Sequence, residues 1–272
     1  MKRYGLHAVL CVVLMFGASA NAADKPDAVR PEVGKPLQEA QALMKSGKYK
    51  EAMAKVNDAD AAAGKTASEL ILITRMRAAV ASASGDTEGA NKAYESLLSS
   101  GKVTGREAVT MEQAMSVNFY KEKDYAKAAT WAQRYFKDGG SDPAMRTVLL
   151  QSYYLGNDCT AVNKMLGGVE ESRATEADLQ ILANCYLRQK DTAGYVGAIE
   201  KLVVSYPKKE YWTDLLARVQ KKPGFSDRLG IHVYRLRMAT GNLSGADDYL
   251  EMAQLALQAG VPSEAKMIVD KG

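Results

Sequence analysis

The chain has 272 residues, of which 47% are hydrophobic, and its 36 basic and 32 acidic side chains leave a formal net charge of +4. This near balance of charge gives no reason to expect a nucleic acid or a membrane surface as partner. His7 and His232 are the two histidines of the sequence, so a histidine-rich metal site is excluded, and no metal or other cofactor is expected.

Residues 1–22 have the three parts of a secretory signal peptide. Lys2 and Arg3 precede an apolar run from Ala8 to Phe16, and small residues follow it up to Ala22. The apolar run is too short to span a bilayer. We therefore expect cleavage after Ala22, a periplasmic or secreted location, and no transmembrane anchor in the mature chain.

The next segment is rich in proline and charge and poor in apolar residues. We expect residues 23–35 to form a flexible leader, followed by a helical repeat domain over 36–272. Beyond the leader no segment alternates apolar and polar residues as a half-buried strand requires, so the pattern predicts an all-α fold.

A short polar turn followed by a helix recurs along the domain, with a small residue at one fixed place in the helix. At one such place, 34 residues after Ala161, the sequence has Tyr195 instead of a small residue. A period of about 34 residues with helix–turn–helix content indicates a solenoid of stacked helix pairs. The small residues are Ala52, Ala90, Ala128, Ala161, Gly230 and Ala265.

The periodicity predicts about seven antiparallel helix pairs. None of the seven prolines interrupts a predicted helix, as the missing backbone N–H of proline requires. The pairs are expected at 36–46 and 49–62, 67–84 and 86–99, 105–122 and 124–138, 142–155 and 158–170, 175–189 and 191–206, 209–221 and 225–240, and 244–259 and 262–271.

The pattern resembles the tetratricopeptide repeat (TPR) family over residues 36–272. In that family a small residue of the first helix lies twelve positions before the small residue of the second. The matching positions depart from this at Leu149 and Arg218. The resemblance implies a right-handed superhelical solenoid whose first helices line a concave groove. The matches are Ala40, Ala78, Ser116, Ala183 and Ala253.

The resemblance also implies which side chains face a partner segment in the groove. Amides, tyrosines and arginines there would suit an extended peptide. Tyr153 and Tyr154 cannot both face the groove, because neighbours on a helix point 100° apart; the alternative for the whole set is ordinary polar faces and core tyrosines. The implied groove residues are Arg75, Gln113, Tyr120, Lys121, Arg146, Tyr153, Gln180, Asn184 and Arg188, with Tyr154 competing for the place of Tyr153.

Catalytic motifs find little support. Gly64-Lys65-Thr66 lacks the earlier glycine of a phosphate loop and reads as a helix end. His232 lies in a helical segment where a packed or surface imidazole is ordinary. We therefore expect no catalytic residues. A cluster of Tyr206, Lys208, Lys209, Tyr211 and Trp212 could hold a glycan or an acidic peptide, although packing between pairs is the simpler role.

Cys159 and Cys185 remain after signal cleavage, in a compartment that permits disulfides. The repeat places Cys159 at the start of one helix and Cys185 near the end of an antiparallel neighbour, so the pair is a candidate disulfide. Two separate buried thiols are the alternative.

The last predicted helix ends the sequence at Gly272 without a further polar helix to cover it. Solenoids usually end in such a helix. Either the sequence is the front part of a longer protein, or a partner or a second copy covers this end, which would be self-association through the C-terminal end.

The sequence therefore predicts a non-catalytic scaffold that binds a segment of another protein, in the periplasm or outside the cell, with a bacterial envelope protein as the expected partner. An envelope assembly factor or chaperone that uses its termini and convex surface is the second reading. An envelope hydrolase is the third.

Overall fold

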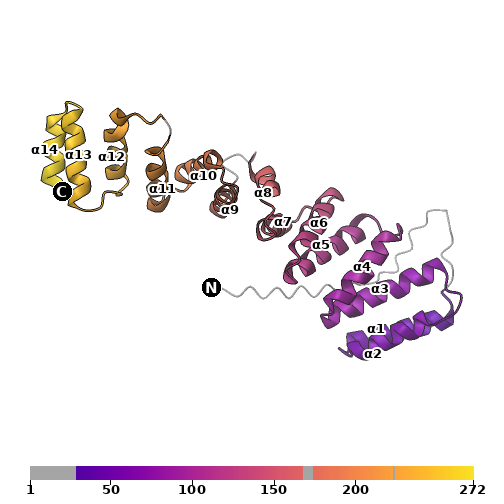
Figure 1. The fold of residues 1–272 in the computed structure, drawn as a ribbon. Helices are drawn as coiled ribbons and strands as arrows, with labels where there is room; N and C mark the ends of the chain where they lie inside the picture. The colour runs from indigo at the N-terminus through magenta and orange to yellow at the C-terminus, as the bar shows by residue number, and fades with distance from the viewer. Residues whose placement is uncertain (1–28, 168–173, 223) are drawn as a thin grey trace. The chain divides into compact units, whose positions relative to one another are not determined.

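The computed structural model describes residues 29–167, 174–222 and 224–272 (Figure 1). In these ranges all the regular structure is helical, with fourteen α-helices and one short 3₁₀-helix, which confirms the all-α prediction. Contacts divide the described residues into two compact units, and the division between Ala93 and Tyr94 falls within one helix. The predicted signal peptide lies outside the described residues.

The helices follow one another in chain order and pack as consecutive pairs. α1 packs on α2 in the first unit, and α5–α6, α7–α8, α9–α10, α11–α12 and α13–α14 pack in the second. The bounds are α1 Pro31–Lys45, α2 Tyr49–Asp60, α3 Ala67–Ser84, α4 Thr87–Ser99, α5 Gly105–Lys121, α6 Tyr125–Lys137, α7 Pro143–Leu155, α8 Cys159–Leu166, α9 Glu176–Arg188, α10 Thr192–Ser205, α11 Lys209–Val219, η2 Asp227–Leu229, α12 Gly230–Ala239, α13 Ala246–Gln258 and α14 Pro262–Lys271.

α1 begins at Pro31, earlier than the predicted boundary at residue 36, so Pro36 lies inside the helix. Proline is tolerated as the first helical residue because its missing N–H would be unpaired there. Arg30 fixes the start of the helix, since its backbone N–H and its guanidinium both donate to the carboxylate of Glu69 in α3. The end of the predicted leader is thus anchored to the repeat domain.

The turns within three successive helix pairs of the second unit, α5–α6, α7–α8 and α9–α10, are built alike. Lys123, Asn157 and Lys190 have φ of 64°, 61° and 59°, and each is followed by an aspartate. That aspartate accepts a backbone N–H from the first turn of the next helix, as N-caps do. The turn therefore sets where α6, α8 and α10 begin.

These caps correct the predicted register of the fourth pair. Ala128 is the fourth residue of α6 and is 0% exposed. The fourth residue of α8 is Val162, also 0% exposed, whereas Ala161 is only partly buried. Val162, not Ala161, therefore occupies the place of Ala128. One residue is a 100° rotation on a helix, and the shift puts Tyr154, rather than Tyr153, in the place of Tyr120.

Each unit has its own apolar core. In the second unit the main core runs from α6 to α11, and a smaller one joins α12, α13 and α14. In the first unit, α1, α2 and α3 share a core. None of the helices in the described ranges combines the length and the apolar character needed to cross a membrane.

Candidate binding site

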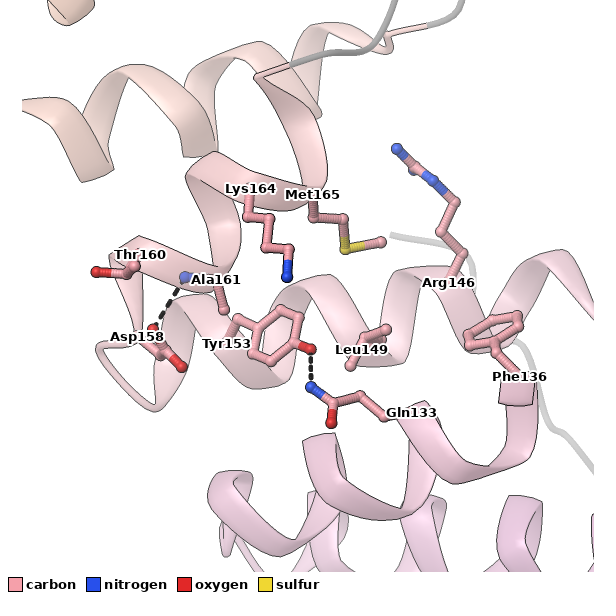
Figure 2. Close-up of a pocket in the computed structure, with 10 residues that line it drawn as sticks. All are labelled: Gln133, Phe136, Arg146, Leu149, Tyr153, Asp158, Thr160, Ala161, Lys164 and Met165. Carbon is pink, nitrogen blue, oxygen red and sulfur yellow. Dashed lines mark hydrogen bonds between the residues drawn. The ribbon is translucent and has the colours of Figure 1, made fainter. Parts of the chain in front are cut away.

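Helices α6, α7 and α8 of the second unit surround a pocket of about 680 Å³ (Figure 2). Its lining combines apolar side chains with hydrogen-bond donors and charged groups. α6 contributes Gln133 and Phe136; α7 contributes Arg146, Leu149 and Tyr153; the turn and α8 contribute Asp158, Thr160, Ala161, Lys164 and Met165.

The two α7 side chains that the sequence predicted for a groove, Arg146 and Tyr153, both line this pocket. Tyr153 is 8% exposed, and its hydroxyl accepts a hydrogen bond from the amide of Gln133 in α6. Nη1 of Arg146 lies 3.3 Å from Oδ2 of Asp178, at the start of α9. Contacts within the protein thus hold both side chains in place.

The polar wall opposite comes from α8. Oδ1 of Asp158 accepts a hydrogen bond from the backbone N–H of Ala161 at 3.0 Å, so this oxygen is already engaged in capping α8. Figure 2 shows Lys164 extending from α8 toward Tyr153. Lys164 is exposed and makes no ion pair within the described part of the chain. Among the described residues it therefore has no ion-pair partner to leave before it meets a ligand.

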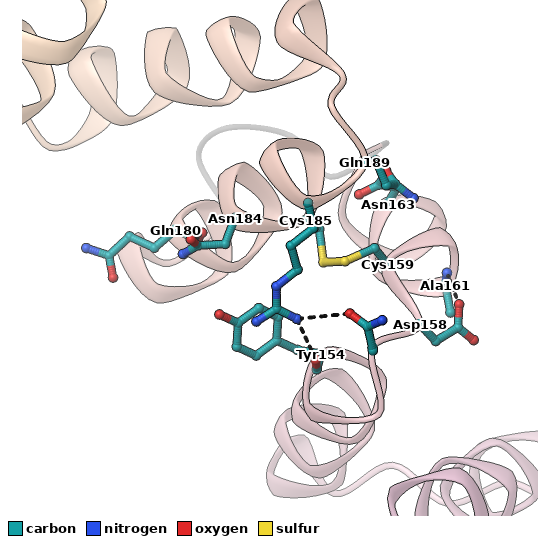
Figure 3. The surroundings of a disulfide bond; sticks show 11 residues. Tyr154, Asp158, Cys159, Ala161, Asn163, Gln180, Asn184, Cys185 and Gln189 are labelled. Atoms are coloured by element: carbon teal, nitrogen blue, oxygen red, sulfur yellow. Dashed lines mark hydrogen bonds between the residues drawn. A yellow bond between two sulfur atoms is a disulfide. The ribbon is translucent and has the colours of Figure 1, made fainter.

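A disulfide fixes the start of α8 (Figure 3). Cys159, the first residue of α8, is bonded to Cys185 of α9, with the two Cα atoms 5.1 Å apart, and both residues are buried. α8 has only 8 residues, so its own helical hydrogen bonds hold it weakly. The disulfide therefore helps to keep the α8 wall of the pocket in position.

Most other predicted groove residues contact a neighbouring helix pair instead of lining this pocket. Tyr120 donates to Oε1 of Gln151 at 2.6 Å, and burial raises the pKa of its phenol. Nε2 of Gln113 donates to Asp142 at 3.1 Å, where α7 begins. These contacts join α5 to α7.

The same kind of contact joins α7 to α9 and α9 to α11. Cζ of Arg188 lies 4.4 Å from the ring centroid of Tyr154, and its Nη1 donates to the Tyr154 carbonyl. Gln180 donates to the hydroxyl of Tyr211 at 2.6 Å. We call these four pairings of first helices, Gln113–Asp142, Tyr120–Gln151, Tyr154–Arg188 and Gln180–Tyr211, the inter-pair contacts.

Three predicted residues stand apart. Lys121 is exposed at the end of α5, and the amide of exposed Asn184 donates to the carbonyl of Gln180 in its own helix. Arg75 lies on α3 in the first unit, so it is described apart from the pocket.

A second hollow, of about 440 Å³, lies between α5 and the turn that precedes α7. Gln113 and Tyr135 line it, but Gln113 is bonded to Asp142 there, and the Tyr135 hydroxyl accepts the backbone N–H of Asp142. Its polar groups are therefore largely committed to holding the turn.

The basic and aromatic cluster near Trp212 is a packing junction. Tyr206 donates to the carbonyl of Ala174, and Trp212 packs against the main core. Lys208 and Tyr211 both donate to Glu176, and these bonds, that of Lys208 first, lower the pKa of Glu176. The cluster thus ties α11 to the start of α9.

A metal centre is not evident among the residues that the structure describes. In those ranges, histidine, cysteine, aspartate and glutamate side chains form no group of three or more that could hold a metal ion. His232 is exposed on α12, with Nδ1 3.2 Å from Nη1 of Arg235.

Sequence reasoning missed the second helices as a source of site residues. Gln133 and Phe136 of α6, and Lys164 and Met165 of α8, line the pocket although the predicted groove used first helices alone. Asp158 was the sequence signal that could have found them. As an N-cap it sets where α8 begins, and therefore which residues of α8 face α7.

The fold and the pocket define an all-α protein built from consecutive helix pairs. No protein-family model matches the chain, and no curated protein matches it. Among solved structures, the TPR2AB domain of yeast Sti1 in complex with pHSP90 is similar at 15% identity and a TM-score of 0.43, covering 88% of each chain. The C-terminal part of a TPR repeat-containing protein from Cytophaga hutchinsonii is similar at 14% identity and a TM-score of 0.38, covering 86% of this chain and 92% of that chain.

Proposed function

We propose that this protein is an exported, non-catalytic scaffold that binds a segment of another polypeptide in the pocket between α6, α7 and α8. The pocket itself is the observation that carries the proposal. Its lining combines apolar area from Phe136, Leu149 and Met165 with hydrogen-bond donors, notably Lys164. Binding sites commonly join apolar area for affinity with a few placed polar groups for orientation.

The pocket walls are held before any partner arrives. Gln133 bonds Tyr153, Asp178 pairs with Arg146, and the Cys159–Cys185 disulfide fixes α8. A preformed surface loses little conformational entropy on binding, which raises affinity. These restraints support capture by a rigid surface.

The proposed location is the periplasm or the cell exterior, and the partner is an envelope or secreted protein. The predicted signal peptide at 1–22 and the Cys159–Cys185 disulfide support this, because disulfides persist mainly in oxidising compartments. Sequencing the N-terminus of the exported chain tests it, and the expected first residue is Ala23.

First-helix residues can extend the contact beyond the pocket. Lys121 and Asn184 are exposed and can meet a bound segment directly. Tyr120, Gln180 and Arg188 would have to leave their inter-pair contacts first. We therefore place the main binding energy in the α6–α8 pocket.

Site-specific photo-crosslinking in cells that export the chain tests the proposal. A photoreactive residue at Thr160, exposed at the pocket rim, should give a defined protein adduct. The same residue at Thr130, exposed on α6 outside the pocket, is the matched control and should not. Ala161→Phe should remove the adduct by filling the pocket from α8.

The proposal fails if Thr160 and Thr130 give the same adducts, or if the Thr160 adduct persists in the Ala161→Phe variant. Either result would place the partner elsewhere on the chain. Circular dichroism of each variant should show unchanged helical content, so that loss of the adduct cannot be attributed to unfolding.

A further inference from the structure

We propose that the α6–α8 pocket selects an internal acidic–apolar pair of the partner polypeptide, in which a carboxylate side chain lies next to a bulky apolar side chain. This inference rests on the proposed function and names the chemistry that the same pocket would recognise.

The charge of the lining favours a carboxylate. Of the charged residues that line the pocket, Arg146 is paired with Asp178, and Asp158 accepts a backbone N–H. Lys164 is left without an ion pair in the described ranges, and Figure 2 shows it extended over the pocket toward Tyr153. Charge complementarity of this kind selects among partners more than it adds affinity.

The hydroxyl of Tyr153 adds a second donor beside Lys164. That hydroxyl already accepts from Gln133, so its own proton can be given to a ligand oxygen. Bonds to a charged acceptor are stronger than neutral ones. A carboxylate between Lys164 and Tyr153 would satisfy both donors.

The apolar part of the pocket lies beside these donors. Phe136, Leu149, Ala161 and Met165 line it, and Met165 is a side chain that adapts to different apolar shapes. A bulky apolar side chain next to the carboxylate would cover this apolar area. The pocket is open to solvent, so the bound chain can continue past it.

The test uses random short segments displayed within a loop of a carrier protein, so that no free chain terminus is presented. Selection on the full mature chain should enrich segments with Asp or Glu next to Leu, Ile, Met, Phe or Trp. Lys164→Glu should weaken binding of these segments by about tenfold or more. Lys137→Glu makes the same charge change on an exposed lysine of α6 outside the pocket and should leave binding unchanged.

A charge swap separates recognition from structural damage. Segments in which Lys or Arg replaces the acidic residue should bind the Lys164→Glu variant better than the original chain. Retained helical content and thermal midpoint confirm that the variant folds.

Each remaining outcome is decisive. One outcome is that the selected segments show no acidic preference, bind the Lys164→Glu variant unchanged, and fail to bind the Ala161→Phe variant. This outcome overturns the inference but leaves the proposed function standing. If neither Lys164→Glu nor Ala161→Phe changes the binding of the selected segments, the pocket is not the binding site. A selection that enriches nothing contradicts the inference and the proposed function together.

Discussion

The guanidinium of Arg218 lies over the ring of Tyr195, with Cζ 4.2 Å from the ring centroid, and both side chains bond the carboxylate of Asp214. Tyr195 and Arg218 are two of the residues that depart from the small-residue pattern of the repeat. Tyr195 belongs to α10 and Arg218 to α11, the next helix along the chain. The two departures therefore compensate each other across one junction.

Because the two side chains act together, truncating either one should lower the free energy of unfolding nearly as much as truncating both. For Tyr195→Ala and Arg218→Ala we expect a coupling free energy of about 1–2 kcal/mol in a double-mutant cycle. Urea unfolding followed by circular dichroism measures it. Free-energy changes that simply add, within about 0.5 kcal/mol, would show that the pair is not a unit.

The sequence predicted the helices well because their ends carry local signals. Thr66 and Thr175 form capping boxes with Glu69 and Asp178, so α3 begins at the predicted residue and α9 begins one residue after it. α1 was extended by a contact with no local signal, the bonds from Arg30 to Glu69, which lies 39 residues away.

The candidate site was predictable only in part, for the same reason. The resemblance to the TPR family implied that Tyr120, Gln180 and Arg188 bind a partner, but each contacts a residue more than 30 positions away. Such distances are fixed by packing between pairs. Arg146 and Tyr153 do line the pocket. Because Val162 rather than Ala161 matches Ala128, however, the face of α7 that carries them is rotated by one residue from the predicted one.

Glu112 should make stability depend on pH near neutrality. Its side chain is 0% exposed, 2.7 Å from Nε of Arg134, and burial first and nearby Asp138 second raise its pKa to about 7. A carboxyl with a raised folded pKa stabilises the fold below its unfolded pKa of about 4.5, and this stabilisation is lost as pH rises toward 7.

In the wild type, Glu112 should lower the free energy of unfolding by about 1–3 kcal/mol as pH rises from 5 to 8. Glu112→Gln should abolish this part of the pH dependence, because glutamine does not ionise. Urea unfolding across that range, compared with the same substitution at exposed Glu122 on the end of α5, measures it. Equal pH slopes for the wild type and Glu112→Gln would contradict the assignment.

The disulfide should contribute both stability and pocket order. Replacing Cys159 and Cys185 together by alanine should lower the free energy of unfolding by about 2–4 kcal/mol. It should also make the protein insensitive to reductant. The finding of two free thiols in the folded, unreduced chain, by mass spectrometry after thiol labelling, would disprove the bond.

The three matching turns give a ranked prediction. Left-handed φ is costly for a residue with a Cβ, so Lys123→Gly and Lys190→Gly should stabilise by a few tenths to about 1 kcal/mol. Asn157→Gly should gain less, because asparagine tolerates this conformation better. Gln254→Gly, at an exposed position inside α13, is the opposite control and should lower the free energy of unfolding by about 1 kcal/mol. Thermal unfolding of the four variants gives the order, and equal effects at all three turns would contradict it.

Amide hydrogen exchange of the full mature chain, with and without a segment recovered by display or by crosslinking at residue 160, tests the central claim most directly. Binding in the pocket predicts slower exchange concentrated in α6, α7 and α8, and no such slowing in the Ala161→Phe variant. Protection that leaves these three helices unchanged and appears elsewhere would contradict it.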